Sequence, residues 1–242
     1  MTETRNAPFW KHPSFAALLQ ANPGLTALER WLPETCCPDI FSGQSFIAGL
    51  PSSYRLHGYD YFFYALTRAL RPARCVEIGV LQGFSLLAVA SALRDNGAGQ
   101  VEGFDLFEDY AFKKEHYQAT AQRLQAAGLE TWARIERQDA FAVADRYSQI
   151  DLLHVDISNH GDTYRTLFAQ WSDKVRQAIV FEGGSAERDQ VDWMQKFSKS
   201  PIRKAIQEIR AGYPAWNICV LEPFPSVTVA VRAGTTICSE EK

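Results

Sequence analysis

The chain has 242 residues and a mass of 27.2 kDa, which corresponds to one globular domain or one domain with an added flanking segment. Its 25 Lys and Arg residues against 28 Asp and Glu residues give a net charge of −3, which argues against nucleic-acid binding through a basic surface. No apolar run approaches the roughly 18 residues of a membrane-spanning helix, and the amino terminus lacks the apolar stretch of an export signal. We therefore expect a cytoplasmic protein that contacts neither membranes nor nucleic acids.

Residues 1–71 differ from the rest of the chain because six prolines interrupt them and prevent long regular elements. The end of this segment, from Tyr59 to Pro72, has the apolar spacing of an amphipathic helix. We interpret 1–71 as a helical flank or lid and 72–242 as the main domain. The aromatic-rich flank and Trp10, Trp31, Trp171 and Trp193 could form a homodimer interface, although isolated apolar residues do not require one.

From residue 74 onward, short β-rich apolar runs alternate with helical patterns. The predicted strands are 75–80, 100–106, 133–138, 151–157 and 178–183. The predicted helices between them are 84–95, 115–127, 141–147 and 162–175. This alternation indicates an α/β fold with a doubly wound, mostly parallel sheet.

Two further apolar runs, 217–224 and 226–234, follow helical patterns at 186–198 and 202–212. Two strands so close in sequence can only form a hairpin, because a parallel return needs a crossover of about a dozen residues or more. We therefore predict a seven-stranded sheet that ends with an antiparallel strand.

The first predicted strand runs into a loop suited to binding a ligand. Gly79 permits a tight turn, Gly83 lets a ligand approach the backbone, and Ser85 lies in the first turn of the next helix, where N–H donors are free. The spacing is not GxGxxG, and Glu77 adds a negative charge where a dinucleotide would place its pyrophosphate. A cationic nucleoside without phosphate therefore fits this loop better than NAD.

Two acidic residues at the ends of the next strands support a nucleoside ligand. Asp105 lies 22 residues after Gly83, about where a carboxylate accepts the ribose hydroxyls of a bound nucleoside. Asp139 follows the third strand and could contact the adenine edge, cap the helix that starts near Phe141, or do both.

The run from Val76 to Ser85, together with Asp105, Asp139 and the His154-Val-Asp156 end of strand four, resembles the class I S-adenosylmethionine-dependent methyltransferases. The resemblance covers about residues 72–233 and is greatest to small bacterial O-methyltransferase-like enzymes of specialised metabolism. It implies a Rossmann-like fold and S-adenosyl-L-methionine as cofactor. It also implies roles for the residues carried over by position: Gly79, Gly83 and Ser85 beside the methionine part, Glu77 near its amino group, Asp105 at the ribose and Asp139 at the adenine.

The ends of strands four and five carry the residues expected to act on the methyl acceptor. Asp156 and Glu182 lie at neighbouring strand ends, and His160 is a candidate base because an ordinary histidine pKa near 6.5 suits proton removal at neutral pH. Some similar enzymes bind Mg²⁺ at these two strand ends, but Gly183 stands where that pattern has another acidic residue. Magnesium accepts water ligands, so it is still possible as a second cofactor, although we assign no metal ligands.

The segment after strand five, 185–194, has two interpretations. Ser185 could simply cap a helix whose first turn favours acidic residues, or Arg188, Trp193 and Met194 could border the acceptor pocket. The aromatic stretch from Tyr54 to Tyr64 is either core or a lid over the cofactor.

We predict an enzyme that transfers a methyl group to an oxygen, or less readily a nitrogen, of a small-molecule acceptor. In this hypothesis Asp156, His160 and Glu182 position or deprotonate the acceptor. The alternatives are a protein that binds the same cofactor without methyl transfer, and a nicotinamide-dependent oxidoreductase.

Overall fold

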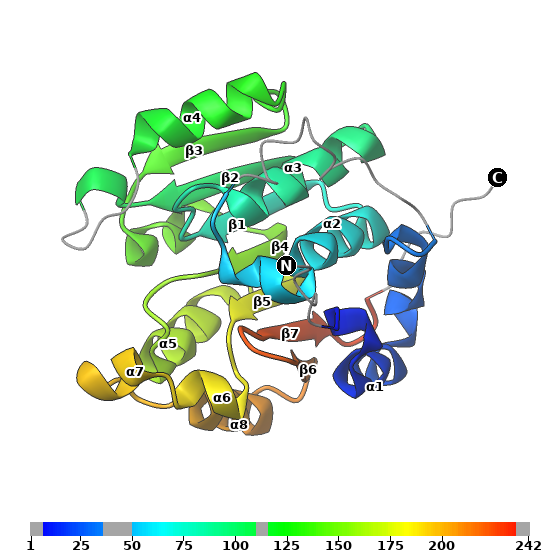
Figure 1. The fold of residues 1–242 in the computed structure, drawn as a ribbon, viewed down its shortest axis with the longest axis vertical. Helices are drawn as coiled ribbons and strands as arrows, with labels where there is room; N and C mark the ends of the chain where they lie inside the picture. The colour runs from blue at the N-terminus through cyan, green and yellow to red at the C-terminus, as the bar shows by residue number, and fades with distance from the viewer. Residues whose placement is uncertain (1–6, 36–49, 110–115, 236–242) are drawn as a thin grey trace, which may run out of the picture.

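The computed structural model describes residues 7–35, 50–109 and 116–235, and these form a three-layer α/β sandwich (Figure 1). Seven strands make one sheet in the order β3-β2-β1-β4-β5-β7-β6. Their bounds are β1 Arg74–Ile78, β2 Gln100–Asp105, β3 Ala133–Arg137, β4 Ile150–Val155, β5 Val175–Glu182, β6 Trp216–Leu221 and β7 Val227–Arg232. The predicted doubly wound, mostly parallel sheet is confirmed.

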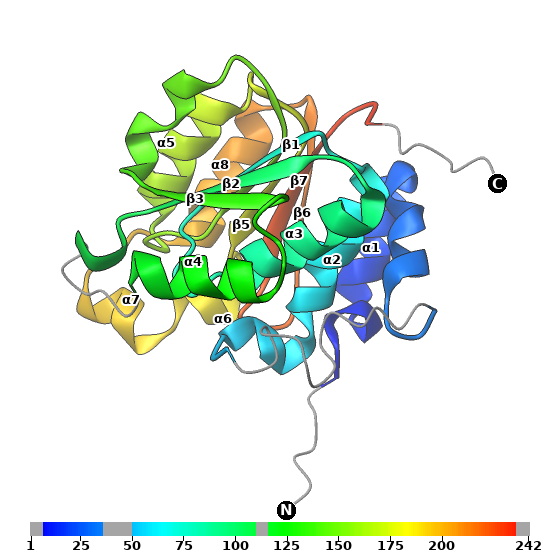
Figure 2. The ribbon, with the colours of Figure 1, turned by 90° about the horizontal axis from the view of Figure 1, so that it is seen from above.

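Helices cover both faces of the sheet, as Figure 2 shows from above. Helices α1 to α4 lie on one face, and α5 and α8 lie on the other. The helices are α1 Pro13–Ala21, α2 Tyr59–Leu70, α3 Phe84–Asn96, α4 Tyr117–Ala126, α5 Gly161–Trp171, α6 Ala186–Asp189, α7 Asp192–Lys196 and α8 Ile202–Gly212. This arrangement leaves the carboxyl ends of β1, β4 and β5 side by side at one edge, where ligands of such sheets bind.

The hairpin of the last two strands is confirmed. β7 pairs antiparallel with β5 and β6 pairs antiparallel with β7, so the antiparallel strand is second from the edge and β6 forms the edge itself. Sequence proximity requires β6 and β7 to be neighbours and leaves open which of them pairs with β5.

Two predicted helices are shorter in the structure. Residues 141–147 form two 3₁₀ turns, Ala140–Ala142 and Ala144–Arg146, in place of one helix. The helix expected over 186–198 is split into α6 and α7 by a break at 190–191. Neither change alters the order of strands in the sheet, because each segment still connects the end of one strand to the start of the next.

The amino-terminal flank packs as part of the layer formed by α1 to α4. Phe9 stacks on Tyr59 with ring centroids 5.2 Å apart, and the Tyr59 hydroxyl donates hydrogen bonds to the carbonyl oxygens of Leu221 and Pro223 at 3.0 and 2.8 Å. Buried residues of the flank share one hydrophobic cluster with those of α3 and β1.

A second hydrophobic cluster fills the opposite face, between the sheet and α5 and α8. Trp171 at the end of α5 is completely buried there, so it is not available for a dimer interface. Among the described residues, no helix has both the length and the apolar character needed to cross a membrane.

Candidate functional site

The loop between β1 and α3 is shaped by two glycines with positive φ. Gly79 has φ +89°, and a β-carbon there would overlap the carbonyl oxygen of Asp156 at the end of β4. Gly83 has φ +85° and precedes α3. No side chain among the described residues caps α3, so the N–H groups of its first turn point outward from the strand ends. The N–H groups of the first turn of α3 therefore have no side-chain acceptor among the described residues.

Asp105 at the end of β2 holds this loop in place. One carboxylate oxygen accepts hydrogen bonds from the backbone N–H groups of Val80 and Leu81, each at 2.8 Å, and the other accepts one from Phe107, also at 2.8 Å. Hydrogen bonds from amides to a charged carboxylate are stronger than neutral ones. Besides the ribose contact expected of it, Asp105 thus has a structural task that the sequence did not reveal.

Glu77 lies below the loop and is completely buried. One carboxylate oxygen accepts a hydrogen bond from the Ser85 hydroxyl at 2.9 Å, and the other lies 3.3 Å from Nδ1 of His154 without a hydrogen bond of good geometry. Phe63 covers His154 with a ring distance of 4.6 Å. A buried carboxylate oxygen with an incomplete set of donors suits the amino group of a cationic ligand, which is the ligand charge expected from the sequence.

Asp139 caps the 3₁₀ turn that follows β3. Its carboxylate accepts a hydrogen bond from the backbone N–H of Phe141 at 2.8 Å. Of the two roles expected for Asp139, the structure displays the cap. The neighbouring Phe141 has 46% of its surface exposed, so its apolar ring is accessible to solvent near the end of β3.

The ends of β4 and β5 bring together a second group of polar side chains. The Tyr54 hydroxyl donates a hydrogen bond to Asp156 at 3.0 Å. Glu182 is paired with Arg188 through an Oε1–Nη2 distance of 2.6 Å and accepts a hydrogen bond from the Asn159 side chain at 2.6 Å. We call these five residues, Tyr54, Asp156, Asn159, Glu182 and Arg188, the acceptor-end cluster.

Electrostatics in this cluster favour the neutral form of Asp156. Burial raises the pKa of Asp156 well above its usual range, and the charge and hydrogen bond of Glu182 raise that pKa further. Arg188 and Tyr54 act in the opposite direction, with a smaller effect on the pKa of Asp156. The neutral form of Asp156 is therefore favoured beside Glu182.

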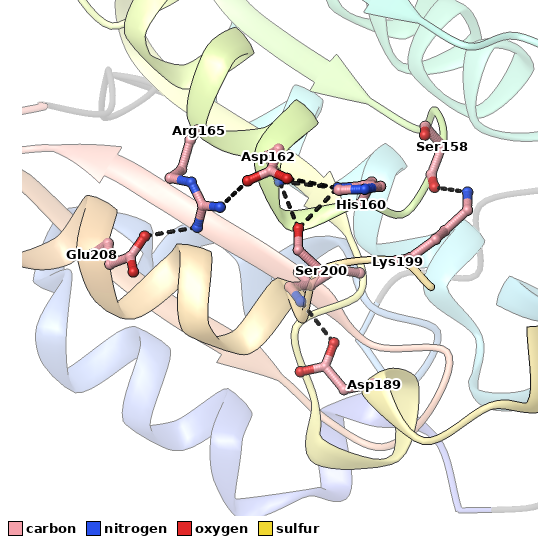
Figure 3. A network of polar contacts seen from close by, with 9 residues as sticks. Ser158, His160, Asp162, Arg165, Asp189, Lys199, Ser200 and Glu208 are labelled. Atoms are coloured by element: carbon pink, nitrogen blue, oxygen red, sulfur yellow. Dashed lines mark hydrogen bonds and ion pairs between the residues drawn. The ribbon is translucent and has the colours of Figure 1, made fainter. Parts of the chain in front are cut away.

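His160 has contacts of a different kind, which Figure 3 shows. It is the N-cap residue of α5: its Nδ1 accepts a hydrogen bond from the Asp162 N–H at 3.2 Å and lies 2.8 Å from the Ser200 hydroxyl. Lys199, next to Ser200, donates to the carbonyl oxygen of Ser158. His160 thus joins the start of α5 to the segment before α8, and its recorded contacts do not include Asp156 or Glu182.

The residues at this edge do not fit a magnesium ion. Arg188 already neutralises Glu182, and Asn159 uses the other carboxylate oxygen. In the described part of the chain, no group of three His, Cys, Asp or Glu side chains is arranged to hold a metal. A β-carbon at Gly183 would lie 3.0 Å from Cγ of Arg188, so the position where the metal-binding pattern has another acidic residue faces this arginine.

Sequence reasoning identified Asp156 and Glu182 but favoured a simple helix start for 185–194. Ser185 is indeed the N-cap of α6, since its hydroxyl accepts a hydrogen bond from the Arg188 N–H at 3.2 Å. The same short helix turns the Arg188 side chain inward onto Glu182. The sequence gives no signal that a charged residue three positions after a cap is buried. It also gives no signal of the contact between Tyr54 and Asp156, because these residues are 102 positions apart.

Comparison with known proteins agrees with this geometry. Residues 76–181 match a family model described as a methyltransferase domain. The fold is similar to the O-methyltransferase TomG of Streptomyces achromogenes, crystallised with S-adenosylmethionine (18% identity, 97% of this chain and 100% of that chain, TM-score 0.60). It is also similar to an O-methyltransferase of Bacillus cereus crystallised with S-adenosylhomocysteine (17% identity, 85% and 100%, TM-score 0.61) and to PaMTH1 of Podospora anserina (18% identity, 91% and 94%, TM-score 0.58).

Residues 76–181 therefore match a methyltransferase domain, and the chain has the Rossmann-like fold of the O-methyltransferases named above. In this chain the sheet of that fold ends with the carboxy-terminal β6–β7 hairpin. The resemblance expected from the sequence is confirmed at this level.

Proposed function

We propose that this protein is an S-adenosylmethionine-dependent O-methyltransferase acting on a small molecule, as in specialised metabolism. The observation that carries the proposal is the β1–α3 loop, in which two glycines and an uncapped α3 lie directly above the buried Glu77. TomG, a similar structure, is an O-methyltransferase involved in tomaymycin synthesis, which supports an acceptor of this general kind.

The backbone of the β1–α3 loop and the charges of nearby carboxylates would bind the cofactor. Gly79, Gly83 and Ser85 would border the methionine part of S-adenosyl-L-methionine, with Glu77 supplying negative charge beneath its amino group. Asp105 would bind the ribose while it holds Val80 and Leu81, and Asp139 would lie at the adenine beside the exposed Phe141. When bound, the cofactor supplies an electrophilic methyl group.

The acceptor-end cluster orients the acceptor and takes up its proton. Methyl transfer by displacement depends mainly on alignment, with a base required only for an unionised hydroxyl. Asp156 lies beside the Gly79 turn, since a β-carbon at Gly79 would touch its backbone, and Glu182 ends the neighbouring strand β5. His160 stays a candidate base, but its Nδ1 accepts the capping hydrogen bond, so in the neutral imidazole the hydrogen is on Nε2. To act as a base, His160 would have to release the cap of α5.

Calorimetry with S-adenosylhomocysteine tests the cofactor assignment. We expect the wild-type protein to bind it equally well with EDTA and with added magnesium. Glu77→Gln and Asp105→Asn should both weaken binding, whereas Glu130→Gln, which changes an exposed carboxylate, should leave it unchanged.

The outcomes separate the three hypotheses. Binding without any methylated product from a broad acceptor set would favour a protein that binds the cofactor and does not transfer the methyl group. Binding of NAD in place of S-adenosylhomocysteine would favour an oxidoreductase and contradict the proposal.

A further inference from the structure

Arg188 is an unusual residue for the interior of this fold. Only 6% of its surface is exposed, and its guanidinium lies between two aromatic rings, with Cζ 5.4 Å from the centre of Trp193 and 5.6 Å from that of Phe224. Within the described part of the chain, Arg188 forms an ion pair with Glu182 alone, with Nη2 2.6 Å from Oε1. Burial of an arginine is costly unless its charge and its donors are satisfied.

Part of this guanidinium has no partner. Nη2 contacts Glu182, but the buried Nε–H has no hydrogen-bond acceptor among the residues that the structure describes. A buried donor without an acceptor costs about 1–3 kcal/mol, so native proteins rarely keep one without a reason. The unpaired donor beside Glu182 therefore points to a ligand that brings an oxygen to this place.

The aliphatic part of the Arg188 side chain also fills the space next to Gly183. A β-carbon on Gly183 would lie 3.0 Å from Cγ of Arg188 and 3.2 Å from the Ile202 side chain. Any acidic side chain at position 183 would have to displace this arginine. Arg188 therefore supplies the positive charge at the acceptor end that a metal ion would otherwise supply.

We propose that Arg188 takes the place of a divalent metal at the acceptor end and that its unpaired N–H edge binds the oxygen of an acidic hydroxyl group, as in a phenol or an enol. This inference deepens the proposed function and rests on it. The acceptor oxygen gives its proton to the Asp156–Glu182 pair and forms the new bond to the methyl carbon. The electrons of the broken methyl–sulfur bond stay on sulfur, which loses its positive charge.

The charges of the cluster favour a hydroxyl over a carboxylate as acceptor. Glu182 already balances the charge of Arg188, so an acceptor that arrived as an anion would add negative charge without a cationic partner among the described residues of the cluster. A neutral hydroxyl avoids that cost and becomes anionic only as its proton moves to the carboxyl pair. The rings of Trp193 and Phe224 beside the guanidinium offer flat apolar contact to a planar acceptor.

The test uses the full chain saturated with S-adenosylhomocysteine in EDTA, with 4-nitrophenol as the probe because its visible absorbance reports its ionised form. We expect wild-type protein to bind the phenol and to increase its ionised fraction. Arg188→Met should weaken phenol binding roughly ten- to hundredfold, the size expected for a lost charge-assisted hydrogen bond. Arg188→Lys, which keeps the charge, should retain part of the binding, and Arg203→Met on exposed α8 should match wild type.

A second measurement follows Mn²⁺ by electron paramagnetic resonance as a probe of divalent metal binding. We expect no stoichiometric binding to the wild-type protein at millimolar Mn²⁺. Stoichiometric binding that Glu182→Gln abolishes would overturn the inference, as would phenol binding that Arg188→Met leaves intact or an absence of phenol binding to the wild-type complex. If the wild-type protein does not bind S-adenosylhomocysteine, the proposed function itself is refuted, so the two failures are distinguishable.

Discussion

The two ends of the candidate site are built in different ways. At the cofactor end, Asp105 binds backbone N–H groups of the adjacent loop, and Glu77 binds Ser85 eight positions away. At the acceptor end, Tyr54, Asp156, Glu182 and Arg188 come from four separate segments, and their contacts are between side chains. One end is fixed by local backbone geometry and the other by the balance of buried charges.

This difference predicts how each end responds to substitution. The loop at the cofactor end should lose more stability from a change of backbone conformation than from a change of side-chain charge. The acceptor-end cluster should instead lose more stability from a change of side-chain charge, because removal of one charged member leaves its buried partner unpaired.

The largest effect should come from breaking the Glu182–Arg188 pair. Arg188→Met should lower the free energy of unfolding by about 3–5 kcal/mol, the usual cost of a buried charge without its partner. The double variant Glu182→Gln/Arg188→Met should recover much of that loss. Urea denaturation of the two single variants and the double variant measures the coupling; additive losses would contradict the charge-built description.

The matching change at the cofactor end is Gly79→Ala. A φ of +89° and the overlap of the new methyl group with the Asp156 carbonyl oxygen should together cost about 3 kcal/mol. Gly97→Ala is the control, because its φ is +67° but its β-carbon would meet no atom within 4 Å. Thermal unfolding of both variants separates the close contact from the strain of positive φ, and equal losses would show that the contact is unimportant.

The pH dependence of stability should report the acceptor end. The folded-state pKa of Asp156 is raised, so its contribution to stability is complete below the unfolded pKa, near 3.8, and is lost as the pH rises through the folded pKa. Asp156→Asn should remove this decline, so the variant should gain stability relative to wild type as the pH rises, by about 1.4 kcal/mol for each unit of pKa shift. Denaturation midpoints measured from pH 4 to 8 test this, and parallel curves for both proteins would contradict it.

Asp105→Asn should have a smaller effect on the cofactor end. The amide keeps one acceptor oxygen but loses the charge and the second oxygen, so at least one of the three loop hydrogen bonds is lost. We expect a loss of about 1–2 kcal/mol in stability. Equilibrium unfolding checks this, with Asp109→Asn on the exposed surface as the control.

The smallest effect should follow from Asp139→Ala. Removal of an N-cap side chain costs about 1 kcal/mol, and Asp139→Asn should restore most of it because asparagine caps equally well. If Asp139→Asn restores stability but not affinity for S-adenosylhomocysteine, the carboxylate also contacts the ligand.

Most of the fold could be predicted from the sequence, because alternating apolar strands and amphipathic helices dictate a parallel sheet with covered faces. The same reasoning placed Glu77, Gly79 and Gly83 on one loop, since neighbours in sequence stay neighbours in space. The order of β6 and β7 could not be predicted, because a hairpin satisfies its own hydrogen bonds whichever strand joins β5.

The acceptor end was predicted only in part for a physical reason. Asp156 and Glu182 follow from the rule that parallel strands end at one edge, but Tyr54 and Arg188 reach that edge from outside the strands. The inward turn of Arg188 depends on the four residues of α6, and the break before α7 is not visible in the helical spacing of 186–198.

The contact between Tyr59 and the region after β6 has a consequence for the order of folding. The partners of its hydroxyl lie 162 and 164 positions later in the chain, and Ser14 reaches Glu222 across 208 positions. During synthesis the flank is made before its partners, so these contacts can form only after residues 221–223 have emerged from the ribosome. The flank therefore precedes most of the sheet in synthesis and takes its final packing after most of the sheet has been made.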